Sequence, residues 1–254
     1  MKHNNLAHNL YEAVKLRLPI TQVKYGNELG LEDAYAIQQQ IIDLKLEEGE
    51  QLSGIKMGFT SKPKMEQVGV NAPIWGRLTN TMMIPNDGVL HLNNYIRPRA
   101  EPEIAFLLKE DLTMEHCGLP LEDLASGVAV AMEICDSRYR DFKFSLWDVI
   151  ADNCFAAGYV LGQWKTPETG ISDIAMTLNC NGKTMESGNS NSILGNPLTS
   201  LWEAIKLTTQ YGFGLKRGMV VLAGAATPSI YLNSGDKVEV TAEQLGSVNI
   251  KVEA

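Results

Sequence analysis

The chain has 254 residues, of which 44% are hydrophobic and 20% are charged, and its formal net charge is −8 at pH 7. This profile is typical of a globular protein with ample core. The acidic balance excludes non-specific nucleic-acid binding, which requires a basic surface, but it does not exclude small anionic substrates, which respond to local fields. No apolar run approaches the length of a membrane span.

The first 50 residues predict two helices. Apolar residues recur at helical spacing in the segment 4–17, at Leu6, Leu10, Ala13 and Val14. This segment lacks the apolar core of a secretion signal, so we expect a cytoplasmic protein. A second amphipathic helix is expected over 31–48, where Gly49 would end it.

The next segment, "LSGIKMGFT" over 52–60, predicts a strand that carries Lys56. Lys56 shares one strand face with Gly54, Gly58 and Thr60, so its amine has small neighbours that let a ligand approach closely. The alternative is a surface lysine whose stem lies along apolar groups while its charge reaches water. A further helix is expected after Ser61 as N-cap, with Pro63 in its first turn.

From residue 74 onward, short strands alternate with turns, which are marked by "PNDG" (85–88), "CNGK" (180–183) and "NSGD" (233–236). Helices are expected only over about 145–153 and 197–211, the second with Pro197 in its first turn and Gly212 after its end. We therefore predict an α+β fold in a single catalytic domain, 1–254. A helical N-terminal portion (1–70) would lie against a β-rich, metal-binding body (71–254).

The strand "RPRAEPEIAFLL" (97–108) has an unusual charge pattern. One face is uniformly apolar, whereas the other carries Arg99, Glu101 and Glu103, with the two glutamates roughly 7 Å apart. One interpretation is a solvated face on an edge strand, which Pro102 favours because proline is confined to edges and bulges.

A second strand changes that interpretation. The run "SGVAVAMEICDSRY" (126–139) is nearly all apolar, as in a strand that is buried on both faces, and Glu133 lies in its middle. A lone buried carboxylate costs several kcal/mol unless it is paired, and Arg99 is one possible partner. Three carboxylates that converge can instead bind one hard cation, Mg²⁺ or Mn²⁺, which prefers oxygen ligands.

The cysteines and histidines point away from other chemistries. The cysteines contain no CxxC pair, so neither a disulfide framework nor a zinc site is expected; they are Cys117, Cys135, Cys154 and Cys180. Cys135 and Cys154 lie in apolar segments, as small core residues do. The histidines form no Ser/His/Asp or HExxH arrangement; they are His3, His8, His91 and His116.

Several motifs together resemble the fumarylacetoacetate hydrolase superfamily and, within it, the hydratase and decarboxylase branch of meta-cleavage aromatic degradation. They span nearly the whole chain and are "GIKMGFTS", "RAEPEIAFLL", "AMEICDSRY", "ADNCFAAGYVLG", "NGKTMESGNSNSILGNP" and "GDKVEV". The stretch "KMGFTSKPKMEQVGVNAPIWGRLTN" is more selective, and it resembles the decarboxylases of that branch that act on 2-oxo-3-hexenedioate. The resemblance implies a β-rich mixed-sheet roll with a small helical N-terminal portion.

The resemblance also implies roles for particular residues. The metal ligands would be Glu101, Glu103 and Glu133. The substrate-binding residues would be Lys56, which is also the active-site lysine, Asn153 and Thr227.

Two segments depart from the family pattern, "SGNSNS" in place of a Gly-x-Gly and "GAATPS" in place of a more glycine-rich form; both affect the pocket rim. Arg77 is a candidate for the far carboxylate of the substrate, but a surface salt bridge explains it equally well, so it stays outside the predicted site.

The implied activity is metal-dependent decarboxylation of 2-oxo-3-hexenedioate, with Mg²⁺ or Mn²⁺ as cofactor. The nearest alternative is the hydratase that adds water to the product dienoate. Acylpyruvate hydrolysis is more distant, because it calls for a water-activating dyad that the sequence lacks, and the non-enzyme alternative is a binding domain fastened by its metal. Expected partners are the dicarboxylic 2-oxo acid, further copies of this chain and the hydratase that receives the product.

Overall fold

The computed structural model describes residues 2–22, 30–61, 65–66 and 72–254. The helix expected after Ser61 lies mostly outside these residues. The helices are α1 (Lys2–Leu16), α2 (Leu31–Glu47), α4 (Leu121–Leu124), α5 (Leu146–Ala151) and α6 (Pro197–Gln210). The strands are β1 (Leu52–Gly58), β2 (Ile74–Thr79), β3 (Gly88–His91), β4 (Arg99–Leu108), β5 (Ala125–Cys135), β6 (Ala156–Leu161), β7 (Ala175–Cys180), β8 (Lys183–Asn189), β9 (Val220–Leu222), β10 (Ile230–Tyr231), β11 (Lys237–Ala242) and β12 (Gly246–Glu253).

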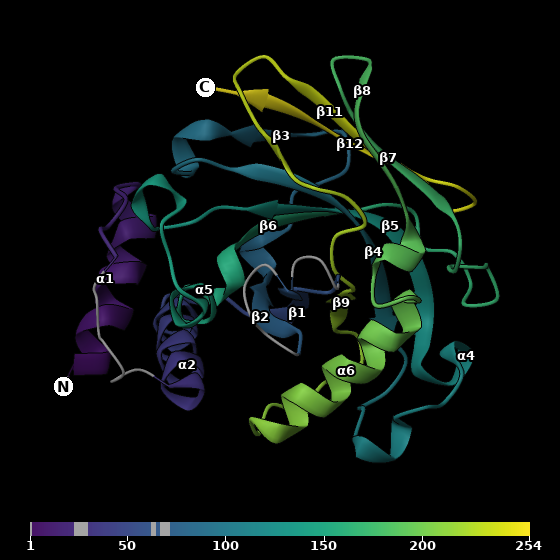
Figure 1. Cartoon of the computed structure of the whole chain (residues 1–254), viewed down its shortest axis with the longest axis horizontal. Coiled ribbons are helices and arrows are strands. Elements are labelled where there is room, and N and C mark those ends of the chain that lie inside the picture. Colours follow the sequence, from purple (N-terminus) through teal and green to yellow (C-terminus); the bar gives the residue numbers. More distant parts are fainter. Residues whose placement is uncertain (1, 23–29, 62–64, 67–71) are drawn as a thin grey trace.

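These strands form two sheets, one with seven strands and one with five (Figure 1). The larger sheet has the order β2-β1-β9-β4-β5-β6, with β10 also paired to β4, and the smaller has the order β3-β12-β11-β7-β8. Only the β1–β9 and β3–β12 pairs are parallel among these ladders. The α+β class and the mixed-sheet roll with a helical N-terminal part are thus confirmed.

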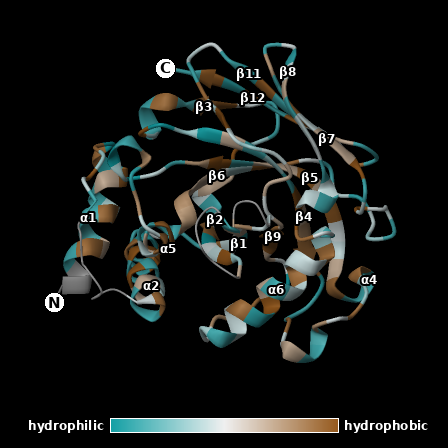
Figure 2. Cartoon of the chain, in the orientation of Figure 1, coloured by the Kyte–Doolittle hydropathy of each residue, from teal (hydrophilic) through white to brown (hydrophobic). Residues whose placement is uncertain are grey.

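The core lies between the sheets, where β4 and β5 pack against β7, β11 and β12. The even-numbered apolar face of β4 points into this core, because side chains alternate along a strand. Figure 2 shows the same distribution, with hydrophobic residues concentrated on the central strands and hydrophilic ones on the outer loops. The opposite face of β4, which carries Glu101 and Glu103, is therefore left for the site.

The expected helices and turns agree with the structure in most places. α1 and α2 pack together, and α2 also packs on α5 (Figure 1). Asn196 caps α6 with its side chain, Pro197 occupies the first turn, and Gly212 follows the helix with a φ of 68°. The buried strand is shorter than expected, since it ends at Cys135 rather than Tyr139. No described helix is both long and apolar enough to cross a membrane.

The edge-strand interpretation of β4 is wrong, because β4 lies between β5 and β9. Pro102 is tolerated inside the sheet because it lies in the gap between the β10 and β9 pairings. Its carbonyl oxygen accepts a hydrogen bond from the N–H of Ala226, which belongs to a loop rather than a strand. The division at residue 70 stays a prediction; β1, from the expected N-terminal portion, pairs with β9 of the body.

Candidate metal centre and pocket

The β4–β5 register brings the carboxylates together. Glu101 lies directly opposite Glu133, and Glu103 lies opposite Ala131 on the same face. Glu103 and Glu133 are fully buried, whereas Glu101 is half-buried. Like charges that face each other across two strands repel, so this arrangement requires a positive partner.

Lys56 supplies one positive charge. Its Nζ lies 2.8 Å from Oε1 of Glu133 and donates a hydrogen bond to the carbonyl oxygen of Cys154 at 3.1 Å. The residue is 4% exposed, so the surface-lysine interpretation is wrong. Lys56 also meets Glu133 across two intervening strands, β9 and β4, which requires the strong coiling of the sheet.

A close backbone contact holds the Cys154 carbonyl at this place. Gly76 pairs with Lys56 across the β1–β2 ladder. A Cβ on Gly76 would lie 2.5 Å from the carbonyl oxygen of Asn153, so only glycine lets this segment pass β2 so closely. The close approach at Gly76 of β2 therefore positions the Cys154 carbonyl oxygen, which accepts the hydrogen bond of Lys56.

The electrostatics of the pocket follow from this crowding. Burial and the neighbouring Glu133 raise the pKa of Glu103 well above its ordinary value, although Lys56 opposes the shift. Burial lowers the pKa of Lys56, but Glu133 and the other acidic neighbours outweigh burial, so the net shift is upward. Lys56 consequently keeps its positive charge.

Several of the buried carboxylate oxygens have no hydrogen-bond donor among the described residues. Apart from the ion pair with Lys56, neither oxygen of Glu133 receives a hydrogen bond from any described residue. Oε2 of Glu103 accepts the N–H of Gly224 at 2.8 Å, while Oε1 has no donor in the described part of the chain. Buried oxygens without donors are what a bound cation would satisfy.

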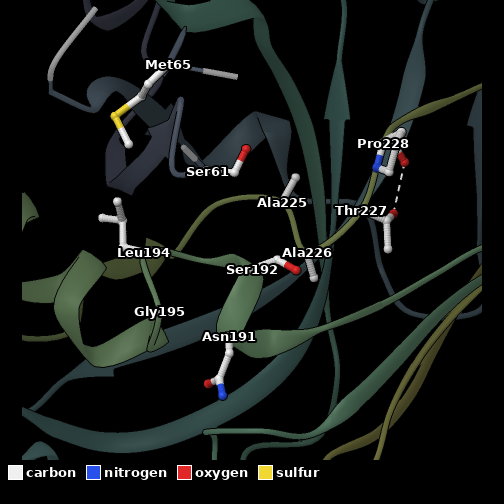
Figure 3. A pocket seen from close by; sticks show the side chains of 10 residues that line it. All are labelled: Ser61, Met65, Asn191, Ser192, Leu194, Gly195, Ala225, Ala226, Thr227 and Pro228. Atoms are coloured by element: carbon white, nitrogen blue, oxygen red, sulfur yellow. Dashed lines mark hydrogen bonds between the residues drawn. The ribbon is translucent and has the colours of Figure 1, made fainter. Parts of the chain in front are cut away.

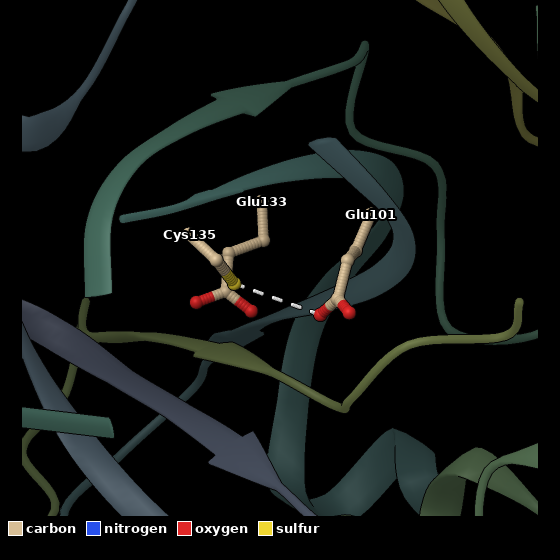
Figure 4. A group of neighbouring side chains, drawn as sticks. All are labelled: Glu101, Glu133 and Cys135. Atoms are coloured by element: carbon tan, nitrogen blue, oxygen red, sulfur yellow. Dashed lines mark hydrogen bonds between the residues drawn. The ribbon is translucent and has the colours of Figure 1, made fainter. Parts of the chain in front are cut away.

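One further side chain, which the sequence analysis treated as core, joins the carboxylates. Ligand atoms of Glu101, Glu133 and Cys135 all lie within 4.8 Å of one another, and Figure 4 shows them pointing toward a common point. Glu103 is not a member of this group. Cys135 follows Glu133 by two positions on a strand, and this spacing was the sequence signal for a shared face.

Two members of this group, Glu101 and Cys135, line a cavity of about 420 Å³, whereas Glu133 is not among its lining residues. Lys56, Glu101 and Cys135 line its polar end, and mostly apolar residues line the remainder, including Phe142, Phe144 and Phe155.

Arg99 also lines this cavity. Its guanidinium lies 3.8 Å from the ring centre of Phe142 and 4.0 Å from that of Tyr231, so it is held between aromatic faces. The ion pair of Glu133 is with Lys56 rather than with Arg99.

The predicted residues Asn153 and Thr227 lie elsewhere. The Asn153 side chain accepts the N–H of Arg77 at 2.7 Å and donates to its carbonyl oxygen at 2.8 Å, which fastens this segment to β2. Thr227 lines a neighbouring cavity of about 730 Å³ and donates to the Pro228 carbonyl oxygen (Figure 3). Their substrate-binding roles stay predictions.

The two cavities share Ala225 and Pro228 in their walls. Residues of both segments that depart from the family pattern, such as Asn191 and Ala226, line the larger cavity, so these departures meet in space.

Arg77 does not line the Lys56 cavity. It is buried, its guanidinium lies over the rings of Trp75 and Phe213, and it donates to Gln38 at 2.5 Å. The surface salt bridge considered for Arg77 is therefore wrong.

Comparison with known proteins relates this geometry to chemistry. Residues 51–253 match the family model described as fumarylacetoacetate (FAA) hydrolase C-terminal. A 4-oxalocrotonate decarboxylase from Pseudomonas sp is 43% identical over 98% of this chain and 97% of its own. A 2-keto-4-pentenoate hydratase from Paraburkholderia phymatum is 36% identical over 85% of this chain and 83% of its own. The structure of 4-oxalocrotonate decarboxylase from Pseudomonas putida G7, complexed with magnesium and adipate, matches with a TM-score of 0.94 and 30% identity, covering 99% of this chain and 97% of that one.

Proposed function

Because the chain belongs to the fumarylacetoacetate hydrolase family, we propose that it decarboxylates 2-oxo-3-hexenedioate (4-oxalocrotonate) with the help of a divalent cation. The products would be CO₂ and 2-hydroxypenta-2,4-dienoate, a step in meta-cleavage degradation of aromatic compounds. The observation that carries the proposal is the buried Glu133, which faces Lys56 and Glu101 at the polar end of an open cavity.

The donor set fits a hard cation. Glu101, Glu103 and Glu133 provide oxygens on adjacent strands, and Oε2 of Glu133 has no hydrogen-bond donor among the described residues. Mg²⁺ is the first choice because the decarboxylase of known structure binds it, and Mn²⁺ suits the same ligands. When bound, the cation supplies a Lewis acid for the 2-oxo acid end of the substrate.

Two cationic side chains of the protein would then stabilise the negative charges of the substrate during the reaction. The bond to the far carboxylate breaks, CO₂ leaves, and the electron pair of that bond moves along the conjugated chain to the ketone oxygen, which takes up one proton from solvent to become the 2-hydroxy group. Lys56 holds a fixed positive charge beside the place where this negative charge develops, and such preorganised charges stabilise transition states. Arg99, held by Phe142 and Tyr231, gives the pocket a second cationic group that suits a doubly charged substrate.

The hydratase is the second candidate, because hydratase relatives share much of the sequence. It would use the same acidic residues and the same 2-oxo acid chemistry, but it would add water to the dienoate. A pocket with two cations favours a dicarboxylate, which the hydratase's substrate is not.

The decisive experiment follows CO₂ and ultraviolet absorbance together. The purified protein receives 2-oxo-3-hexenedioate and, separately, 2-hydroxypenta-2,4-dienoate, with Mg²⁺ and then with a chelator. We expect metal-dependent CO₂ release from the first compound and little consumption of the second. Consumption of the dienoate without CO₂ release would establish the hydratase, and inertness toward both would reopen acylpyruvate hydrolysis or a binding role.

The proposal includes a cellular setting. All four cysteines are free thiols, as in proteins of a reducing compartment, which supports a cytoplasmic location. The dienoate product is unstable, so transfer to a partner hydratase within a complex of several chains would protect it. Co-purification of the hydratase with this chain, and light scattering of the isolated chain, test the two associations separately.

A further inference from the structure

The thiol of Cys135 is placed as a ligand rather than as core packing. Its Sγ donates a hydrogen bond to Oε2 of Glu101 at 3.6 Å, and it shares a strand face with Glu133 two positions earlier. In Figure 4, the thiol and the two carboxylates converge from β4 and β5 on the same space. Cys135 also lines the 420 Å³ cavity, so small solutes reach it.

The spacing suits a tetrahedral ion with mixed ligands. Bonds of about 2.3 Å to sulfur and about 2.0 Å to oxygen, at a tetrahedral angle, place the two ligand atoms roughly 3.5 Å apart. The observed separation of 3.6 Å between Cys135 Sγ and Glu101 Oε2 agrees with this value.

Glu133 provides the independent indication of a ligand. It is fully buried; its Oε1 is paired with Lys56 Nζ at 2.8 Å, whereas its Oε2 has no hydrogen-bond partner within the described residues. It belongs to the same three-residue group as Cys135, whereas Glu103 does not. Two sets of metal ligands therefore share Glu101 and Glu133. The carboxylate of Glu103 completes one set, and the Cys135 thiol completes the other.

We propose that Glu101, Glu133 and Cys135 form a binding site for a soft or borderline divalent cation, Cd²⁺ or Zn²⁺, which overlaps the proposed magnesium site. Thiolate ligands select such ions, whereas Mg²⁺ prefers oxygen. The inference rests on the position of the proposed metal centre but not on the proposed reaction.

Binding is balanced in protons and in charge. On binding, the ion displaces the proton of the Cys135 thiol. The S–H bond then breaks, a sulfur–metal bond forms, and one proton passes to solvent. Two carboxylates and one thiolate, together with the Lys56 ammonium, neutralise the doubly charged ion. Because the ion occupies Glu101 and Glu133, it excludes Mg²⁺ and inhibits any activity that depends on Mg²⁺.

Titration of the metal-free full-length protein with Cd²⁺ tests the site directly. We expect thiolate-to-cadmium charge-transfer absorption in the ultraviolet, on the short-wavelength side of the aromatic bands, that saturates at one ion per chain. Cys135→Ser should remove this absorption and weaken Cd²⁺ binding by roughly 100-fold, because even changes outside the ligand shell cost about 10–100-fold. Its Mg²⁺ affinity, measured by calorimetry, should not change. Cys135→Ala provides a second variant if the serine disturbs folding.

Cys154→Ser is the matched control. Cys154 is a buried thiol in the wall of the same cavity, but its Sγ donates to the Trp75 carbonyl oxygen at 3.0 Å and it lies outside the three-residue group. This variant should keep the charge-transfer band.

Two results would overturn the inference, namely no band in the unaltered protein or a band that survives Cys135→Ser. Neither depends on turnover. A protein that decarboxylates with Mg²⁺ but shows no band would retain the proposed function and lose this site. A protein that shows the band but does not decarboxylate would retain this site and lose the proposed function.

Discussion

Lys56–Glu133 and Arg138–Asp152 are both buried ion pairs, but their hydrogen bonds differ. The Arg138 guanidinium donates to the side chain and to the carbonyl oxygen of Asp152, and the Arg138 N–H donates to Oδ2 at 2.9 Å. Both carboxylate oxygens of Asp152 thus have donors. In the other pair, the Lys56 ammonium lies 2.8 Å from Oε1 of Glu133, but Oε2 has no hydrogen-bond donor in the described part of the chain.

This difference indicates that Arg138–Asp152 stabilises the fold, whereas Lys56–Glu133 belongs to the functional site. A buried charge stabilises a fold only when hydrogen bonds complete its shell, and Arg138–Asp152 meets that condition. Nearby Asp136 does as well, because it accepts the backbone N–H groups of Ile96 and Arg97 at 2.7 Å each. Glu133 keeps open coordination positions at a cost in stability, and those positions are its capacity to bind a cation.

Glu133→Gln should produce the largest loss. The substitution keeps the shape but removes the charge that the cation needs, so kcat/KM with Mg²⁺ should fall by roughly 10³-fold. The unpaired Lys56 should also lower the free energy of unfolding by about 3–5 kcal/mol.

The double variant Glu133→Gln with Lys56→Met should recover stability but not activity. This combination separates the two losses of the single variant. Wild-type turnover in either variant would contradict the metal centre.

Arg138→Met tests the scaffold pair and should cost about 3–5 kcal/mol in the free energy of unfolding at pH 8, since it leaves a buried carboxylate without its cation. Burial raises the pKa of Asp152 to about 7 despite Arg138. Because the pKa of Asp152 is higher in the folded state, its contribution to the free energy of unfolding is fully present below its pKa in the unfolded chain. This contribution is lost as the pH rises through about 7. Urea unfolding should therefore show a smaller loss at pH 5.5 than at pH 8, and activity per folded molecule should be unchanged.

Lys56→Met should lower kcat by roughly 10²-fold, because it removes a charge that acts on the reacting groups. The affinity for Mg²⁺ should change much less, since the carboxylates remain. Steady-state kinetics and calorimetric Mg²⁺ titration measure the two quantities separately. Equal losses in both would reduce Lys56 to a structural partner of Glu133.

Mg²⁺ itself should give the smallest effect and the most direct comparison of the two pairs. At about 100 times its dissociation constant, it should stabilise the protein by about 2.7 kcal/mol. Thermal unfolding should show this gain in the unaltered protein and in Arg138→Met but not in Glu133→Gln. A gain that persists in Glu133→Gln would place the ion elsewhere.

Local patterns were enough to predict much of this molecule. Strand alternation put Glu101 and Glu103 on the face opposite the core, and the apolar run around Glu133 indicated a buried strand. Capping and turn residues identified α6 and the hairpin turn at 181–182. These features depend on neighbours in sequence, which a single sequence displays.

Features that depend on contacts between distant segments were missed. Pro102 indicated an edge strand, but only the tertiary structure shows a loop beside it. No sequence pattern showed that the Asn153 amide bonds to β2, a contact that exists because Gly76 lets the two segments touch. The Arg138–Asp152 pair spans a loop and a helix end, and no spacing rule connects them.

The placement of Glu101 directly across from Glu133 also protects the sheet during assembly. A shift of β4 by one residue against β5 turns every side chain of that strand to the other face. Such a slip would drive Glu101 and Glu103 into the apolar layer between the sheets, where ionised carboxylates are most costly. The charges that form the pocket therefore make the incorrect pairing far less stable than the correct one. The same two strands thus provide the metal-binding carboxylates and disfavour the shifted register.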